Sequence, residues 1–149
     1  MKVRDAEFGD LDILVHFTTQ EAFEAEGIKK NTDMLREGIR AALENDKIAR
    51  YWILVDETNN PIGSGSIIRE WSDWNAGWYW WIQSMYVSQK YRGQGLMNLL
   101  LSSIRSSMEL EGALELRLYV HNENKGAIKA YQKAGFSKSK YEIMILNRD

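Results

Sequence analysis

The feature that most constrains the fold is a change in apolar spacing between residues 78 and 120. An apolar run, Trp78–Val87, precedes apolar residues at three- and four-residue intervals, which predict an amphipathic helix that Gly112 ends. Residues 114–120 then alternate apolar and polar side chains, which predicts a strand with one apolar face. A strand, a helix and a strand in this order predict a βαβ unit, in which the two strands lie side by side and parallel.

The remaining periodicity predicts a mixed α/β fold with a mostly antiparallel sheet. Further strands are expected at Val3–Asp5, Tyr51–Val55, Ile62–Ile68 and Tyr141–Leu146. Helices are expected over residues 11–18, from an Asp33 cap to about Leu43, and over Asn124–Ala134. Residues 18–32 between the first two helices read as a loop or a broken helix. We therefore expect a central sheet of six to seven strands with about four helices on its faces.

Composition narrows the class of protein. A length of 149 residues suits one domain spanning 1–149, and the absence of cysteine excludes disulfides, thiolate metal sites and a catalytic cysteine. No apolar run approaches the roughly 18 residues of a membrane span, and the N-terminus does not resemble a signal peptide, so a cytoplasmic protein with no membrane partner is expected. No metal site is predicted.

The net charge of −2 is unevenly spread, with −4 in residues 1–48 and +2 in residues 49–149. Without a basic excess, nucleic-acid binding is disfavoured as the main task. The asymmetry fits a solvated helical face, and it gains meaning only if the basic part meets an anion.

A glycine-rich loop stands where the Trp78–Val87 strand gives way to the long helix. It reads Tyr91-Arg92-Gly93-Gln94-Gly95-Leu96. Glycines let the backbone approach a ligand, and the first N–H groups of a helix form an anion site that suits a diphosphate. The dinucleotide pattern would need a third glycine where Asn98 stands, and the Gly-Lys-Ser/Thr of a P-loop is absent. Alone, the loop fits a structural turn into a helix equally well.

A second group of residues makes the loop more specific. Asn124 opens the last predicted helix, and Tyr131 lies seven positions on, two turns later on the same face. Taken singly, Asn124 reads as a helix cap and Tyr131 as a core residue. The ordered series of glycine loop, long helix, alternating strand, Asn124, Tyr131 and Gly135-Phe136 is much rarer than either.

In these residues the sequence resembles the GNAT superfamily of N-acetyltransferases. The family's phosphate motif, Gln/Arg-xx-Gly-x-Gly/Ala, is similar to Arg92, Gly95 and the position of Met97. Its later signature is similar to the segment from Asn124 to Phe136. Met97 departs from the motif, which usually has a small residue there to keep the diphosphate pocket open.

The resemblance implies a sheet that splays between two parallel strands and admits the pantetheine arm of acetyl-CoA. By resemblance, the cofactor-binding residues lie on the strand before the loop, in the loop and on the last helix. They are Met85, Tyr86, Val87, Arg92, Gly93, Gln94, Gly95, Leu96, Met97, Asn124 and Tyr131.

The resemblance also implies catalytic roles for direct attack by an amine in a ternary complex. The Met85 amide would stabilise the developing oxyanion, and the Tyr131 hydroxyl would protonate the departing thiolate. For the general base, Glu26 and Glu24 rank first among several carboxylates near the predicted loop and the Trp-rich turn. The other candidates are Glu21, Glu70 and Asp73, with His121 an outside one and His16 a helix-face residue.

The acceptor stays open between a small-molecule and a peptide amine. Five tryptophans fall in one expected hairpin: Trp71, Trp74, Trp78, Trp80 and Trp81. They would form an aromatic wall for an apolar or cationic acceptor, or else a partly buried sheet edge or the contact of a homodimer. A catalytically inactive acyl-CoA-binding sensor or interaction module is the main alternative, and a nucleotide-phosphate enzyme is a third.

Overall fold

The computed structural model describes residues 1–148, and the chain divides into two compact units. The first unit is Met1–Tyr119. The second begins at Val120 and is described as far as Arg148. The expectation of one domain over residues 1–149 stays a prediction.

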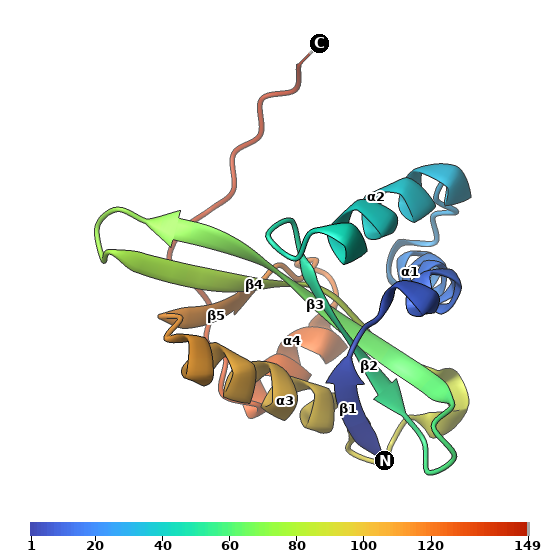
Figure 1. Ribbon diagram of the computed structural model, residues 1–149. Coiled ribbons are helices and arrows are strands. Elements are labelled where there is room, and N and C mark those ends of the chain that lie inside the picture. The colour runs from blue at the N-terminus through green and yellow to red at the C-terminus, as the bar shows by residue number, and fades with distance from the viewer. Residues whose placement is uncertain (149) are drawn as a thin grey trace. The chain divides into compact units, whose positions relative to one another are not determined.

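The first unit is built on a mixed sheet with the strand order β1-β2-β3-β4-β5 (Figure 1). The strands are β1 Lys2–Asp5, β2 Arg50–Val55, β3 Pro61–Ser72, β4 Gly77–Val87 and β5 Glu115–Leu118. Neighbours pair antiparallel except β4 and β5, which pair parallel, so the βαβ unit is confirmed.

The prediction of six to seven strands was wrong, because the described residues hold five. The missing strand is Tyr141–Leu146, which has no regular secondary structure. Its mostly apolar side chains suit a strand, but a strand also requires a neighbouring backbone to pair with its N–H and C=O groups. The sequence pattern of one segment does not show whether such a neighbouring backbone is present.

Helices cover both faces of the sheet in the first unit (Figure 1). The helices α1 Leu11–Glu26 and α2 Thr32–Glu44 lie on one face, and α3 Leu96–Glu111 lies on the other. Short 3-10 turns, Phe8–Asp10 and Gln89–Tyr91, come before α1 and before the loop that leads into α3.

Helix α1 corrects the expected loop or broken helix over residues 18–32. It continues to Glu26 and ends at Gly27, whose φ of 67° is left-handed. Alanine, glutamate and glutamine are strong helix formers, which explains why the polar stretch stays helical until a glycine ends it. The cap of α2 is also corrected: Asn31, rather than Asp33, accepts the N–H groups of Asp33 and Met34 through its side chain.

The core of the first unit lies on both sides of the sheet. Under α1 and α2, the buried residues are Leu14, Val15, Ile39, Ile53 and Val55. Under α3, Gly65 lets the helix approach closely, because a Cβ on it would lie 3.2 Å from Ile104 Cδ1. The sheet, whose strands span residues 2–118, is therefore packed against helices on both faces.

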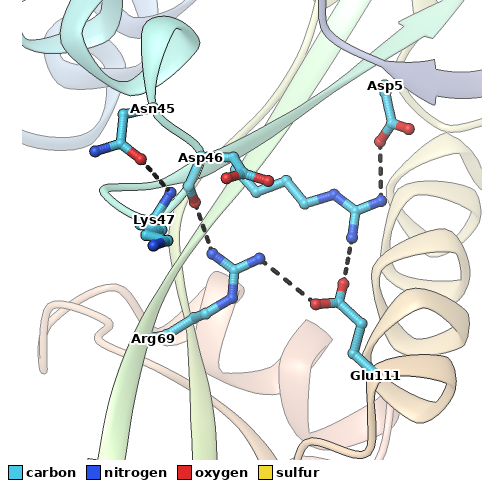
Figure 2. A network of polar contacts seen from close by, with 7 residues as sticks. Asp5, Asn45, Asp46, Lys47, Arg69 and Glu111 are labelled. Atoms are coloured by element: carbon cyan, nitrogen blue, oxygen red, sulfur yellow. Dashed lines mark hydrogen bonds and ion pairs between the residues drawn. The ribbon is translucent and has the colours of Figure 1, made fainter.

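An ion-pair network fixes the C-terminal end of α3 to the sheet (Figure 2). Arg50 on β2 bridges Asp5 at 3.0 Å and Glu111 at 2.6 Å. Arg69 on β3 donates to the Asp46 carbonyl at 2.7 Å and lies 3.7 Å from the other Glu111 oxygen. One glutamate thus joins α3 to two strands.

The second unit contains α4, Lys125–Lys133. Asn124 is its N-cap and accepts the Ala127 N–H at 3.2 Å, so the capping role is confirmed. After the helix, the Phe136 N–H donates to the Tyr131 carbonyl at 2.9 Å, and the two rings meet edge to face at 5.6 Å. The residues after α4 therefore pack back against the helix through the contact between Tyr131 and Phe136.

Candidate functional site

Strand β4 is irregular just before the glycine loop. Its pairing with β3 passes from Ser66–Ser84 to Ile67–Ile82, so Gln83 is an extra residue that forms a β-bulge. The parallel pairing with β5 covers Tyr79–Ile82 and ends before the bulge. Residues 84–87 therefore pair with β3 alone within the first unit, and one edge of their backbone is left for other partners.

The Met85 N–H uses this edge. It donates to the Glu21 carboxylate at 2.6 Å and so points away from β3. The Met85 side chain is buried and lies beside Gly65. A fixed N–H that is directed out of the sheet, two residues from the end of the strand, is the kind of donor that stabilises a developing oxyanion.

Glu21 holds this N–H from helix α1 and is partly buried between the helix and the sheet. Burial raises the pKa of Glu21 to about 7, although the Met85 N–H and the Ser84 hydroxyl act in the opposite direction. A carboxyl group that exchanges its proton near neutral pH is suited to acid–base catalysis.

Glu21 was a candidate from the sequence, but two other glutamates ranked above it. The signal that favours it is helical spacing: Leu14, Phe17 and Glu21 lie on one face of α1, and Leu14 and Phe17 are buried. Once α1 is known to continue past residue 18, that face brings Glu21 to the sheet.

The two glutamates ranked first have other surroundings. Glu24 forms two contacts with the Arg92 guanidinium, at 2.8 and 2.9 Å, and this pairing holds the pKa of Glu24 below its usual range. Arg92 Nε also donates to the Val87 carbonyl at 2.8 Å. Glu26 is exposed at the last position of α1. Their catalytic roles stay predictions.

The predicted cofactor strand and loop have geometry that fits an anion. The Tyr86 ring lies 5.3 Å from Phe17, and the Arg92 guanidinium lies over the Tyr86 ring at 5.4 Å. Gly93 and Gly95 have φ of 81° and 75°, which only glycine adopts without strain. A Cβ on either glycine would meet no atom within 4 Å, so the backbone there is open to a ligand.

Helix α3 begins directly at this loop. Gly95 is its N-cap, and the Leu99 N–H closes the first turn on the Gly95 carbonyl at 3.2 Å. The N–H groups of residues 96–98 precede that bond and have no acceptor within the helix, which makes them donors for a phosphate. Leu96 is buried and anchors the turn, while Gln94 and Met97 are exposed. The donor set fits a diphosphate through its backbone.

Asn124 and Tyr131, the other predicted site residues, belong to the second unit. The Asn124 side-chain oxygen is used as the α4 cap. Tyr131 is partly exposed on α4. His121, the outside candidate, accepts the Glu123 N–H at its Nδ1 at 3.1 Å. The structure thus brings Met85, Glu21, Glu24 and Arg92 together in the first unit.

The tryptophans of the β3–β4 hairpin divide into two groups. Trp80 is buried in the core, and Trp81 donates to Glu70 at 2.6 Å. Trp71, Trp74 and Trp78 are exposed, with Trp71 and Trp78 edge to face at 5.1 Å. Both expectations for the exposed three, an aromatic wall and a contact between copies, stay predictions.

Two other kinds of feature are absent from residues 1–148. No group of three or more histidine and acidic side chains in this range is arranged to hold a metal ion. No helix in the same range is long and apolar enough to cross a membrane.

Comparison with family models decides the family. The model of the acetyltransferase (GNAT) family matches residues 13–136, which include the bulged strand, the glycine loop and α4. The chain belongs to the GNAT acetyltransferase family.

Solved structures agree with this assignment. A possible acetyltransferase from Clostridium difficile 630 is 30% identical to this GNAT chain, with a TM-score of 0.93 over 98% of this chain and 96% of that one. A predicted acetyltransferase with acetyl-CoA from Clostridium acetobutylicum is 23% identical, with a TM-score of 0.79 over 98% of this chain and 95% of that one. The second likeness shows the fold alone. A search of curated proteins found no match.

Proposed function

We propose that this chain transfers an acetyl group from acetyl-CoA to a primary amine by direct attack, with a small-molecule or peptide acceptor. Membership of an acetyltransferase family supports the reaction class. The observation that carries the proposal is the Met85 N–H, which points away from β3 at the end of the strand that leads into the glycine loop. Expected cytoplasmic location and homodimer formation stay predictions.

Different backbone segments would bind different parts of CoA. The N–H groups at the start of α3 and the glycines at 93 and 95 would hold the diphosphate of CoA, and the backbone of residues 85–87 would pair with its pantetheine amides. Arg92, Gln94, Leu96 and Met97 would shape this loop. Asn124 and Tyr131 stay predicted cofactor-binding residues. When bound, acetyl-CoA supplies the activated acetyl group.

The catalytic task needs one donor and two proton-transfer groups. In the proposal, the Met85 N–H stabilises the charge that develops on the carbonyl oxygen. The Tyr131 hydroxyl gives a proton to the departing thiolate, a role typically worth about 10² to 10⁴ in rate. Keeping a lysine-like amine neutral near pH 7 costs on the order of 4 kcal/mol unless a base or desolvation helps. Carboxylates on α1 are the candidates.

A thiol-release assay tests the proposal. Wild-type protein is incubated with acetyl-CoA and a panel of primary amines that includes a diamine, amino-acid amides and a short peptide, and CoA thiol is measured against protein-free and amine-free controls. We expect amine-dependent thiol release and a product amine that is heavier by about 42 Da, the mass change when an acetyl group replaces hydrogen. CoA-dependent thermal stabilisation without thiol release would instead support the sensor alternative.

A further inference from the structure

We propose that Glu21 is the general base of the transfer, and that it becomes available when the acetyl carbonyl replaces it on the Met85 N–H. The inference rests on the proposed function and names one residue within it.

Two acceptors, the Glu21 carboxylate and the thioester carbonyl, compete for one donor on β4. The Met85 N–H has a single proton, and in this structure the Glu21 carboxylate accepts it at 2.6 Å. The same N–H is available to a thioester carbonyl, because the neighbouring edge of β4 is unpaired beyond Ile82. The two acceptors therefore compete for one position, and binding of the carbonyl requires the carboxylate to move aside.

Displacement leaves the carboxylate in a useful place. Glu21 is fixed by helix α1, so a change of its side-chain rotamer moves the carboxylate by a few ångströms and keeps it beside the Met85 backbone. A carbonyl on that N–H has its carbon within about 4 Å of the nitrogen. An amine that attacks this carbon therefore passes its proton to a group within hydrogen-bond reach.

The chemical step balances with two proton transfers. The amine reacts in its neutral form: its lone pair forms the new C–N bond, and the C–S bond breaks with its electron pair leaving on sulfur. Glu21 takes one proton from the amine nitrogen, and the thiolate receives one from the Tyr131 hydroxyl. The products are the N-acetyl amine and CoA, and the two side chains are reset by exchange with water.

The surroundings of Glu21 are compatible with a neutral-pH base. On β4, the Ser84 hydroxyl and the Met85 N–H act on it, and on β2 the Tyr51 phenol faces it, with a pKa that burial and the Glu21 charge both raise. Two arginines that contact α1 are paired with other carboxylates. Arg92 is paired with Glu24, and Arg36 of α2 is paired with Asp12 in the first turn of α1 at 2.6 Å.

Binding experiments test the displacement without any acceptor. Calorimetry with acetyl-CoA and with CoA is run at pH 7 in buffers of different ionisation heat. Loss of the Met85 hydrogen bond raises the pKa of Glu21, so wild type should take up a fraction of a proton with acetyl-CoA and not with CoA. Glu21→Gln should lose this uptake. Glu21→Ala should favour acetyl-CoA over CoA by about 2- to 10-fold more than wild type does.

Kinetics test the role of base. With the amine that gives the fastest thiol release, Glu21→Gln should lower kcat by about 10² to 10⁴ and remove the rise of the rate with pH. In wild type this rise should lie near pH 7 for kcat/KM, which reports the free enzyme, and at higher pH for kcat, which reports the complex. Its affinity for CoA should stay within about twofold, which also shows that the variant is folded. Glu57→Gln, an exposed turn residue with the same loss of charge, is the matched control.

The outcomes separate the inference from the function on which it rests. A wild-type protein that neither binds acetyl-CoA nor releases thiol overturns the proposed function itself. An active wild type whose Glu21→Gln variant keeps the same kcat and pH profile overturns Glu21 alone. Loss of the pH dependence in Glu24→Gln or Glu26→Gln, rather than in Glu21→Gln, assigns the base to that residue and likewise overturns the inference.

Discussion

At the scale of single residues, one hydroxyl distinguishes Tyr131 from phenylalanine. Tyr131→Phe keeps the ring and its edge-to-face contact with Phe136, so α4 should be preserved. If the hydroxyl protonates the thiolate, kcat should fall by about 10² to 10⁴ while the CoA dissociation constant changes by less than about twofold. Stopped-time thiol assays and calorimetry measure the two quantities.

A matched variant controls for loss of a phenol elsewhere. Tyr141→Phe makes the same chemical change in the segment after α4 and should leave kcat unaltered. An equal loss of CoA binding and turnover in Tyr131→Phe would show that the hydroxyl holds the cofactor rather than donating the proton.

Residue roles that depend on the local backbone were predictable from the sequence, and those that depend on distant contacts were not. Gly95 at a helix start and Asn124 as a cap follow from neighbouring residues, and the structure has both. The contact between Glu21 and Met85 joins residues 64 positions apart. This contact forms only when α1 packs on the sheet, which no local sequence pattern shows.

At the scale of elements, the junction of the glycine loop and α3 can be tested by filling it. Gly95→Val puts a β-branched side chain at a φ of 75°, where strain costs about 1 to 3 kcal/mol, and directs a Cβ into the open space before the helix. We expect CoA affinity to fall at least about tenfold in calorimetry.

A second glycine separates loss of the site from a general effect of the substitution. Gly38→Val lies in α2, with an ordinary φ and open space for a Cβ, so its CoA affinity should match wild type. Unchanged affinity in Gly95→Val would remove the loop from the cofactor site.

Helices and strands with a strong apolar periodicity could be predicted from the sequence. Features that depend on pairing with another strand could not. The change from helical to alternating spacing correctly placed α3 and β5. The continuation of α1 to Glu26 was missed because polar helix formers carry little apolar signal. The position of the bulge, at Gln83, could not be read from the sequence, because strand register is set by the partner strand and is not visible in one segment.

At the scale of the first unit, α1 connects two parts of the candidate site. Glu21 contacts the Met85 N–H, and one turn later Glu24 holds Arg92, whose Nε donates to the Val87 carbonyl. Both ends of the strand segment 85–87 are therefore held from one helix. Movement of Glu21 away from Met85 leaves the Glu24 contact to keep α1 against the loop.

The free energy of unfolding should depend on pH because Glu21 is partly buried against the sheet. Its pKa rises from 4.5 to about 7 on folding, so between these values the folded state binds more protons than the unfolded state. The stabilisation is fully present below pH 4.5 and is lost as pH rises through about 7. The corresponding loss in the free energy of unfolding is about 3 kcal/mol.

Glu21→Gln cannot ionise and should lack this dependence. At pH 5 its melting temperature should be close to that of wild type, whereas at pH 8 it should exceed wild type by roughly 2 to 4 °C for each kcal/mol recovered. Thermal melts of wild type, Glu21→Gln and the exposed-turn control Glu57→Gln between about pH 4 and 9 measure the difference. The amide of the Glu21→Gln variant can still accept the Met85 N–H, so the hydrogen bond itself is preserved in the comparison. Parallel curves for wild type and Glu21→Gln would therefore mean that the carboxyl group is not desolvated by the fold, and its pH dependence in catalysis would need another source.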